Sequence, residues 1–253
     1  MKFIAIIPAR YASTRFPGKP LALLGGKPVI RRVYEQVADV LDDVVVATDD
    51  RRIYDAVKAF GGKVEMTSPN HKSGTDRCWE AYCKQGAAAY DVVVNVQGDE
   101  PFIQPSQLQT LKRCFDDPST DIATLVKPFA PADGLAALEN PNSPKVLLDT
   151  QSRALCFSRS VIPYLRGVPR EEWLSAHTFY KHIGLYAFRT EVLRAVTALP
   201  HGVLEKAESL EQLRWLENGC RIAVGITDAE TIGIDTPEDL ERAEAFLKVK
   251  GER

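Results

Sequence analysis

The sequence lacks any apolar run near the roughly 20 residues of a membrane-spanning helix. Its first ten residues, "MKFIAIIPAR", are broken by Pro8 and Arg10 and do not resemble a secretion signal. The five cysteines form no CxxC pair and the four histidines show no metal-ligand spacing. We therefore expect a cytoplasmic protein without membrane insertion, whose thiols are reduced rather than held in disulfides or on zinc.

The chain also has little net charge, because 32 Lys and Arg residues nearly balance 34 Asp and Glu residues. A general role in binding nucleic acid or a membrane surface therefore has no support from charge. The balance is uneven along the chain, however. Residues 1–34 contain seven Lys or Arg residues and no acidic residue. This local excess fits a small anion better than a polymer.

The first half of the chain alternates short β-branched runs with helical stretches, a pattern typical of a mostly parallel sheet flanked by helices. The expected strands are 2–7, 43–48, 63–66 and 91–97, and the expected helices are 28–41, 51–62 and 77–89. Ligands of such sheets bind beyond the carboxyl ends of the strands. The basic loop after the first strand, "TDD" at 48–50 and "QGDEP" at 97–101 all fall there.

The pattern changes after about Lys127. Residues 128–144 are rich in Pro, Ala and Asn and are interpreted as a connection. We expect antiparallel strands at 145–149 and 154–158, a strand at 181–189, helices at 190–199 and 205–219, a strand at 221–226 and a last helix to about 250. The sequence thus predicts a single α/β domain over 1–253. Its core would be about 1–127 and 207–250, and its inserted β-rich lobe about 128–206.

The basic loop within "IPARYASTRFPGKPL" carries Arg10, Arg15 and Lys19 close to glycines. Cations and backbone amides together could bind a polyphosphate. The P-loop pattern fails because both GK pairs are followed by Pro, and no GxGxxG follows the first strand. An ordinary solvated loop remains the alternative.

Three acidic segments could hold the Mg²⁺ that often accompanies a polyphosphate, since one or two carboxylates plus phosphate oxygens and waters bind this ion. They contain Asp99 with Glu100, Asp235, and Asp49 with Asp50. Asp235 and Asp50 are also good helix caps. Asp99 is less easily explained as structural, because a buried acid at a strand end needs a partner.

Other polar residues have simple structural interpretations. The segment "HKSGTDR" could contact a base or merely cap a helix through Ser73. His182 lies in an otherwise apolar strand and is typical of a satisfied core or edge residue. Glu208, Glu211 and Arg214 have the spacing of a solvated helix face.

Taken together, nine motifs in order resemble one family, the CMP-Kdo synthetases (3-deoxy-manno-octulosonate cytidylyltransferases). The motifs are "IPARYASTRFPGKPL", "VATDD", "HKSGTDR", "VNVQGDEP", "NPNSPKVLLD", "FSRSVIPY", "KHIGLYAFR", "LEQLR" and "GIDTPEDLE". The resemblance covers nearly the whole chain. It implies a GT-A-like nucleotidyltransferase fold, CTP and Kdo as substrates, CMP-Kdo and pyrophosphate as products, and a role in building the inner core of lipopolysaccharide. It also implies Mg²⁺ dependence and a homodimer formed through the lobe.

The resemblance further implies residue roles. Arg10, Lys19, Asp99 and Asp235 would be catalytic, with Asp99 and Asp235 as the Mg²⁺ ligands. The nucleotide would be bound by Pro8, Ala9, Arg10, Arg15, Lys19, Ser73, Arg77 and Gln97. The sugar would be bound by Arg159, His182, Tyr186, Glu211 and Gln212. No side chain is identified as a general base. The segment "LEKAES" departs from the family pattern in the residues around Glu208, so packing there is open.

Three alternatives stay open. The acid sugar could be 8-amino-Kdo or sialic acid instead of Kdo. A glycosyltransferase of similar fold would often carry a DxD motif, where this chain has "GDE". A nucleotide sensor without catalysis would bind CTP but turn nothing over.

Overall fold

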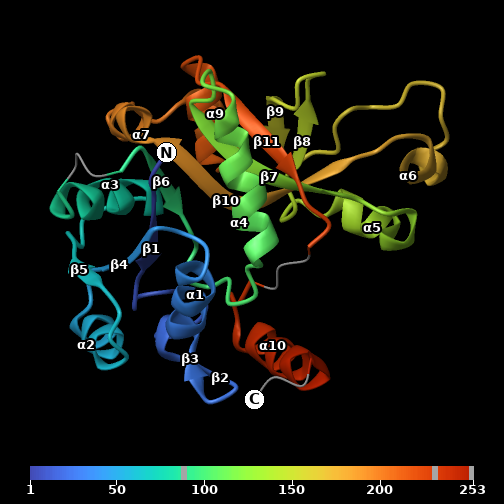
Figure 1. The fold of residues 1–253 in the computed structure, drawn as a ribbon. Helices are drawn as coiled ribbons and strands as arrows, with labels where there is room; N and C mark the ends of the chain where they lie inside the picture. Colours follow the sequence, from blue (N-terminus) through green and yellow to red (C-terminus); the bar gives the residue numbers. More distant parts are fainter. Residues whose placement is uncertain (87–89, 230–232, 251–253) are drawn as a thin grey trace. The chain divides into compact units, whose positions relative to one another are not determined.

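The computed structural model describes residues 1–86, 90–229 and 233–250 (Figure 1). Contacts between Cα atoms divide the chain into two compact units. Unit 1 contains residues 1–109, 187–197 and 230–253, and unit 2 contains residues 110–186 and 198–229. The expected boundaries differ from this division, because the pairing of β7 (Ile122–Pro128) with β11 (Ile222–Ile226) assigns both strands to unit 2.

Unit 1 is built on four parallel strands in the order β6 (Val92–Asn95), β1 (Phe3–Ala9), β4 (Asp43–Thr48) and β5 (Val64–Met66). The expected strands are therefore confirmed, with ends shifted by no more than two residues. Their valine and isoleucine side chains are almost wholly buried, as expected for strands covered on both faces.

Helices of unit 1 pack on this sheet. α1 (Val29–Ala38) packs on β1 and β4, α2 (Arg51–Ala59) on β4 and β5, and α3 (Gly74–Lys84) on β1, β4 and β6. α7 (Thr190–Thr197) packs on α3 and β6. α3 begins three residues before the expected start, because Ser73 caps it. Residues 87–89 of that expected helix lie outside the described residues.

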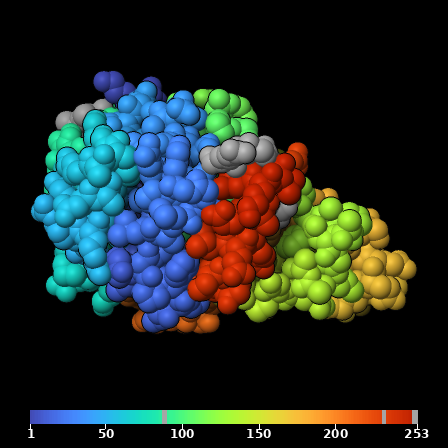
Figure 2. All heavy atoms as spheres, turned by 90° about the horizontal axis from the view of Figure 1, so that it is seen from below, coloured from blue at the N-terminus to red at the C-terminus, as the bar shows by residue number. Residues whose placement is uncertain are grey.

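The C-terminal helix α10 (Pro237–Lys250) packs beside β2 (Leu23–Leu24) of the short β2–β3 hairpin, whose second strand is Lys27–Pro28. Figure 2 shows this helix in red against the blue N-terminal segment. Glu244 accepts a hydrogen bond from the Gly25 amide at 2.7 Å. Gly25 and Gly26 both have positive φ and form the hairpin turn, so their freedom serves this turn.

Unit 2 contains the parallel pair β7–β11 and the expected antiparallel pair β8 (Lys145–Leu148) and β9 (Ala154–Ser158). β8 also pairs with β10 (Tyr180–Arg189), where Lys181 lies opposite Lys145. Phe129, Leu138, Trp173 and Phe179 form a separate small core in this unit. Its described helices include α5 (Gly134–Glu139), α6 (Trp173–Ala176), α8 (Val203–Glu208) and α9 (Glu211–Glu217).

Two expectations for these segments were wrong. The supposed connection 128–144 contains α5, whose first residue, Gly134, has a positive φ of 75°. The supposed helix 205–219 is two helices, because Ser209 adopts a left-handed conformation with φ 52° between α8 and α9. α4 (Pro105–Arg113) was not predicted. Within the described ranges, the structure contains no helix long and apolar enough to cross a membrane.

Candidate active site

A pocket of about 160 Å³ lies in unit 1 at the carboxyl ends of β1 and β6. Because the strands are parallel, their carboxyl ends share one edge of the sheet, where the sequence predicted the ligand site. The pocket is lined by Pro8, Ala9, Arg10, Ala12, Ser13, Lys19, Pro20, Gln97, Gly98 and Asp99. Six predicted site residues thus meet in one place.

Close backbone approach explains the glycine in "QGDEP". A Cβ at Gly98 would stand 2.9 Å from the carbonyl oxygen of Pro8, a contact that side chains do not make. Gly98 therefore lets the loop after β6 approach the end of β1. Asp99 is carried to the pocket by the same approach.

Lys19 connects the two predicted metal ligands. Its Nζ lies 2.5 Å from Asp99 Oδ2 and 3.1 Å from Asp235 Oδ1. Burial disfavours the charge of Lys19, but the two carboxylates outweigh it and raise the pKa of Lys19. Arg15 adds a second cation, 3.1 Å from Asp235 Oδ2, on a side chain that is mostly exposed.

Asp235 is free to make these contacts because another residue begins α10. Thr236 Oγ1 accepts a hydrogen bond from the Asp239 amide at 3.3 Å, and Asp239 Oδ2 accepts from the amides of Asp235 and Thr236. The Ile234 amide also donates to the carbonyl oxygen of Asp99 at 2.9 Å. This backbone contact brings the two acids side by side.

These carboxylates fit the coordination of Mg²⁺. Two carboxylates converge on one positive charge, the Lys19 ammonium, and Mg²⁺ is held in nucleotide sites by one or two carboxylates plus phosphate oxygens. The described residues offer no group of three or more His, Cys, Asp or Glu for a metal held by protein alone. Any Mg²⁺ here would need ligands beyond these two carboxylates, such as phosphate oxygens or water.

Glu100 lies next to Asp99 and has a distinct environment. Burial, with the nearby charges of Asp99 and Asp235, raises the pKa of Glu100 to about 7.

Asp50, in contrast, accepts a hydrogen bond from the Arg52 amide at 2.9 Å and caps α2. The cap interpretation of Asp50 is confirmed.

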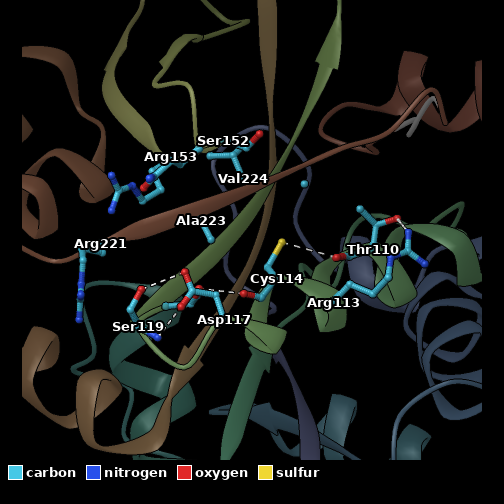
Figure 3. Close-up of a pocket in the computed structure, with 13 residues that line it drawn as sticks. Thr110, Arg113, Cys114, Asp117, Ser119, Ser152, Arg153, Arg221, Ala223 and Val224 are labelled. Atoms are coloured by element: carbon cyan, nitrogen blue, oxygen red, sulfur yellow. Dashed lines mark hydrogen bonds between the residues drawn. The ribbon is translucent and has the colours of Figure 1, made fainter.

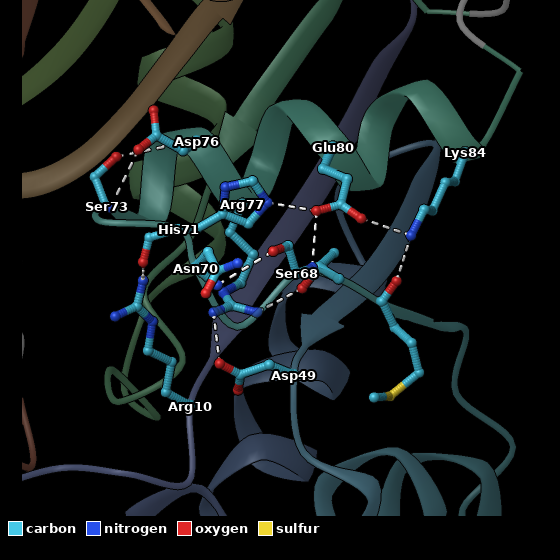
Figure 4. A network of polar contacts seen from close by, with 12 residues as sticks. Arg10, Asp49, Ser68, Asn70, His71, Ser73, Asp76, Arg77, Glu80 and Lys84 are labelled. Carbon is cyan, nitrogen blue, oxygen red and sulfur yellow. Dashed lines mark hydrogen bonds and ion pairs between the residues drawn. The ribbon is translucent and has the colours of Figure 1, made fainter.

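The loop before α3 holds the remaining nucleotide candidates (Figure 4). Ser73 and Asp76 form a capping box at the start of α3, so the cap interpretation of Ser73 is confirmed as well. Gly74 lies against Pro8, which brings this helix start to the end of β1. Arg77 is fully buried, and its guanidinium binds Asp49 Oδ2 at 2.9 Å and the Thr67 hydroxyl.

The predicted sugar residues all lie in unit 2. His182 Nε2 lies 3.1 Å from Thr124 Oγ1, and the His182 ring contacts Phe157 and Tyr186 with centroids 5.3 and 5.2 Å away. Burial lowers the pKa of His182 to about 3, so the ring is neutral. Burial and then the Glu211 charge raise the pKa of Tyr186.

Arg159 binds the backbone of its own unit. Its guanidinium donates to the carbonyl oxygens of Glu208 at 2.6 Å, Pro141 at 2.8 Å and Ser209 at 3.3 Å.

Gln212 is 4% exposed, and its Nε2 has no hydrogen-bond partner among the described residues. A buried amide of this kind has capacity for a polar ligand.

Arg214 was wrongly predicted to lie on a solvated helix face, since it is only 4% exposed. Its Nη2 donates to Glu211 Oε1 at 2.7 Å and its Nε lies 3.6 Å from Glu205 Oε2. The helix break at Ser209 separates Glu208 in α8 from Glu211 and Arg214 in α9, so the three residues do not share one helix face. Sequence spacing alone offered no signal for this buried contact.

A larger cavity, of about 330 Å³, lies elsewhere in unit 2 (Figure 3). Figure 3 shows Arg113 beside Thr110, on the other side of the cavity from Arg153 and Arg221. None of the predicted site residues lines it. The candidate active site is therefore the pocket of unit 1 that Lys19 and Asp99 line.

Comparisons with known proteins agree with the family resemblance of the sequence motifs. A family model described as cytidylyltransferase matches residues 4–223. A 3-deoxy-manno-octulosonate cytidylyltransferase of Phocaeicola vulgatus is 71% identical over 98% of this chain and 98% of its own. One of Bacteroides thetaiotaomicron is 70% identical over 98% and 99%. Among solved structures, a CMP:2-keto-3-deoxy-manno-octonic acid synthetase complexed with CTP is 42% identical, with a TM-score of 0.90, covering 99% of this chain and 100% of the other.

Proposed function

The chain belongs to the family of the 3-deoxy-manno-octulosonate cytidylyltransferases, and on that premise we propose that it transfers the CMP group of CTP to Kdo. The fold has the mostly parallel sheet flanked by helices of the CTP-bound neighbour. The observation that carries the proposal within this chain is the meeting of Lys19 with Asp99 and Asp235 at the strand edge.

In the proposed reaction, the oxygen of the anomeric 2-hydroxyl of Kdo bonds to the α-phosphorus of CTP. The bond from that phosphorus to the bridging β-phosphate oxygen breaks, pyrophosphate leaves, and the hydroxyl proton passes to solvent. Charge gathers on phosphate oxygens during this displacement. Fixed cations beside those oxygens stabilise the transition state, where this charge develops, more than the ground state.

Residues of unit 1 would supply these cations. Arg10 and Lys19 line the pocket and Arg15 reaches Asp235, and this supports the proposal that all three bind triphosphate oxygens. Asp99 and Asp235 would hold Mg²⁺. When bound, that ion would neutralise phosphate charge and lower the pKa of the attacking hydroxyl. Gln97, Ser73 and the backbone at Pro8 and Ala9 would surround the cytidine.

Residues of unit 2 would bind the sugar acid. Gln212 has an unused amide donor, and neutral His182 can accept or donate one hydrogen bond to a hydroxyl. Arg159 carries guanidinium N–H groups beyond the three contacts described and is the proposed partner of the sugar carboxylate. We further propose a cytoplasmic homodimer that serves lipopolysaccharide inner-core synthesis.

Pyrophosphate release tests this function. With CTP, Mg²⁺ and Kdo, we expect pyrophosphate to be released. ATP or UTP in place of CTP should not support this release. A strong preference for 8-amino-Kdo or sialic acid would change the assigned sugar substrate but would leave the assignment of the nucleotide site unchanged. Binding of CTP without release for any sugar would contradict the proposed reaction and favour a sensor or a glycosyltransferase.

The metal assignment has its own test. We expect Asp99→Asn to lower kcat at least about 100-fold at saturating Mg²⁺, because a neutral amide is a weaker ligand and stabilises less positive charge. Asp55→Asn, which alters an exposed pair with Arg51 in the same unit, is the matched control. Near-native turnover of Asp99→Asn would refute the assignment.

A further inference from the structure

The 67–73 loop joins β5 to α3 and is held to one acidic residue of that helix. Glu80 Oε2 accepts a hydrogen bond from the Ser68 amide at 2.8 Å and contacts the ring of His71. Its other oxygen, Oε1, accepts from Lys84 Nζ at 2.7 Å. Glu80 therefore fixes the loop at two separated points, and Lys84 supports it from the next turn of the helix (Figure 4).

The same loop contacts the candidate active site. The guanidinium of Arg10 donates to the backbone carbonyl oxygen of His71, as Figure 4 shows. Arg10 also lines the pocket that contains Lys19 and Asp99. His71 thus connects Glu80 through its ring to Arg10 through its carbonyl group.

We propose that Glu80 is a positioning residue of the nucleotide site, which holds the 67–73 loop so that the His71 carbonyl group orients Arg10 toward the triphosphate. The inference rests on the proposed function, in which Arg10 binds phosphate oxygens. A free arginine side chain has many rotamers, and a fixed carbonyl acceptor restricts them before the ligand arrives. Glu80 itself touches no substrate in this arrangement.

The electrostatics of Glu80 suit this role. Partial burial opposes its charge, but hydrogen bonds from Lys84, the Ser68 amide and His71 outweigh burial and lower the pKa of Glu80 to about 2. The carboxylate is therefore charged throughout the neutral range. Its side chain keeps 26% exposure, so a neutral substitute can be accommodated without burying an unpaired group.

A purely structural role is the competing explanation, because Glu80 and Lys84 also form an ordinary i, i+4 pair on α3. The two explanations differ in which ligand is affected. Orientation of Arg10 matters for phosphate groups, whereas a general weakening of α3 would affect nucleoside binding equally.

The experiment uses the full chain with Glu80→Gln and Lys84→Gln as a matched pair. CTP affinity is measured by calorimetric titration, and cytidine affinity by competition with CTP. We expect Glu80→Gln to weaken CTP about tenfold and cytidine less than about twofold. Lys84→Gln removes the helix pair and the hydrogen bond from Lys84 Nζ to the Met66 carbonyl oxygen, but it leaves the contacts of Glu80 with Ser68 and His71 in place. It should leave both affinities within about twofold.

A double-variant cycle completes the test. In an Arg10→Met background, Glu80→Gln should have almost no further effect on CTP affinity, because the residue through which it acts is gone. Additive losses, or equal weakening of CTP and cytidine, would overturn the inference. Failure of the proposed function is separate, since it would be seen as absent pyrophosphate release in the wild-type protein. A wild-type chain that does not bind CTP would overturn both.

Discussion

Replacement of Arg77 by methionine offers a sharp test of how the nucleotide candidates divide between binding and stability. The family resemblance implied that Arg77 binds the nucleotide, yet its side chain is fully buried. Its guanidinium binds Asp49 at 2.9 Å and the hydroxyl of Thr67. These contacts join α3 to the end of β4 and to the start of the 67–73 loop. We therefore expect the loss of the Arg77 side chain to lower the stability of the fold more than it weakens specific contacts with CTP.

The magnitude follows from the burial of the pair. Removing one partner of a buried ion pair costs about 3–5 kcal/mol, because the other charge is left buried without compensation. The side chain of Asp49 keeps 18% exposure, so some solvation remains and the lower end, about 3 kcal/mol, applies. For a chain of this size each kcal/mol lowers Tm by about 2–4 °C, which gives a fall of about 6–12 °C.

Thermal unfolding followed by circular dichroism measures this effect, with Arg51→Met as the control. Arg51 forms an exposed i, i+4 pair with Asp55 in the same unit, so its loss should leave Tm nearly unchanged. Adding Asp49→Leu to Arg77→Met should restore part of the loss, because both charges are then absent. An Arg77→Met variant with wild-type Tm that no longer binds CTP would refute this reasoning.

Two further predictions concern unit 2. His182 stays neutral when folded because its pKa is lowered from 6.5 to about 3, so the unfolded chain takes up a proton that the folded chain does not, and stability falls as pH drops below 6.5. At pH 5 this loss of folding stability amounts to about 2 kcal/mol. Chemical denaturation at pH 7 and pH 5 should show a smaller loss of stability for His182→Asn than for the wild-type protein, by about this amount. Arg214→Met should raise KM for the sugar about tenfold or more with KM for CTP unchanged, since Arg214 holds Glu211 at 2.7 Å. Arg214→Lys should recover part of the loss in pyrophosphate-release kinetics, and equal changes in both KM values would contradict a role at the sugar.

The edge of the sheet that carries the site could be predicted from sequence for a physical reason. Runs such as 91–97 are short and rich in valine, as is typical of a strand buried on both faces. Once parallel strands are inferred, their carboxyl ends must lie at one edge. Arg10 and Asp99 then lie near each other without any knowledge of side-chain contacts, and the pocket lined by both residues agrees with this.

The arrangement of the helices around Arg214 could not be predicted in the same way. Helical periodicity continues across 205–219, and nothing in Ser209 as a residue type demands the left-handed conformation that ends α8 there. The break changes which side chains share a face, and so the buried contact of Arg214 with Glu205 has no counterpart in the spacing. Tertiary packing, which sequence periodicity does not describe, decides this detail.

The dual interpretation of Asp235 is the most instructive case, because the sequence held the deciding signal in the residues after it. An acid before Thr-Pro can cap a helix, and that capping role competes with any role at a ligand. Thr236 and Asp239 stand three residues apart, the spacing of a capping box, and Pro237 suits the first helical position. In the structure these residues satisfy the start of α10 without the carboxylate of Asp235. That carboxylate is then available to lie against Lys19 and Arg15, so a helix start completed by its neighbours is what makes an acid at this position chemically useful.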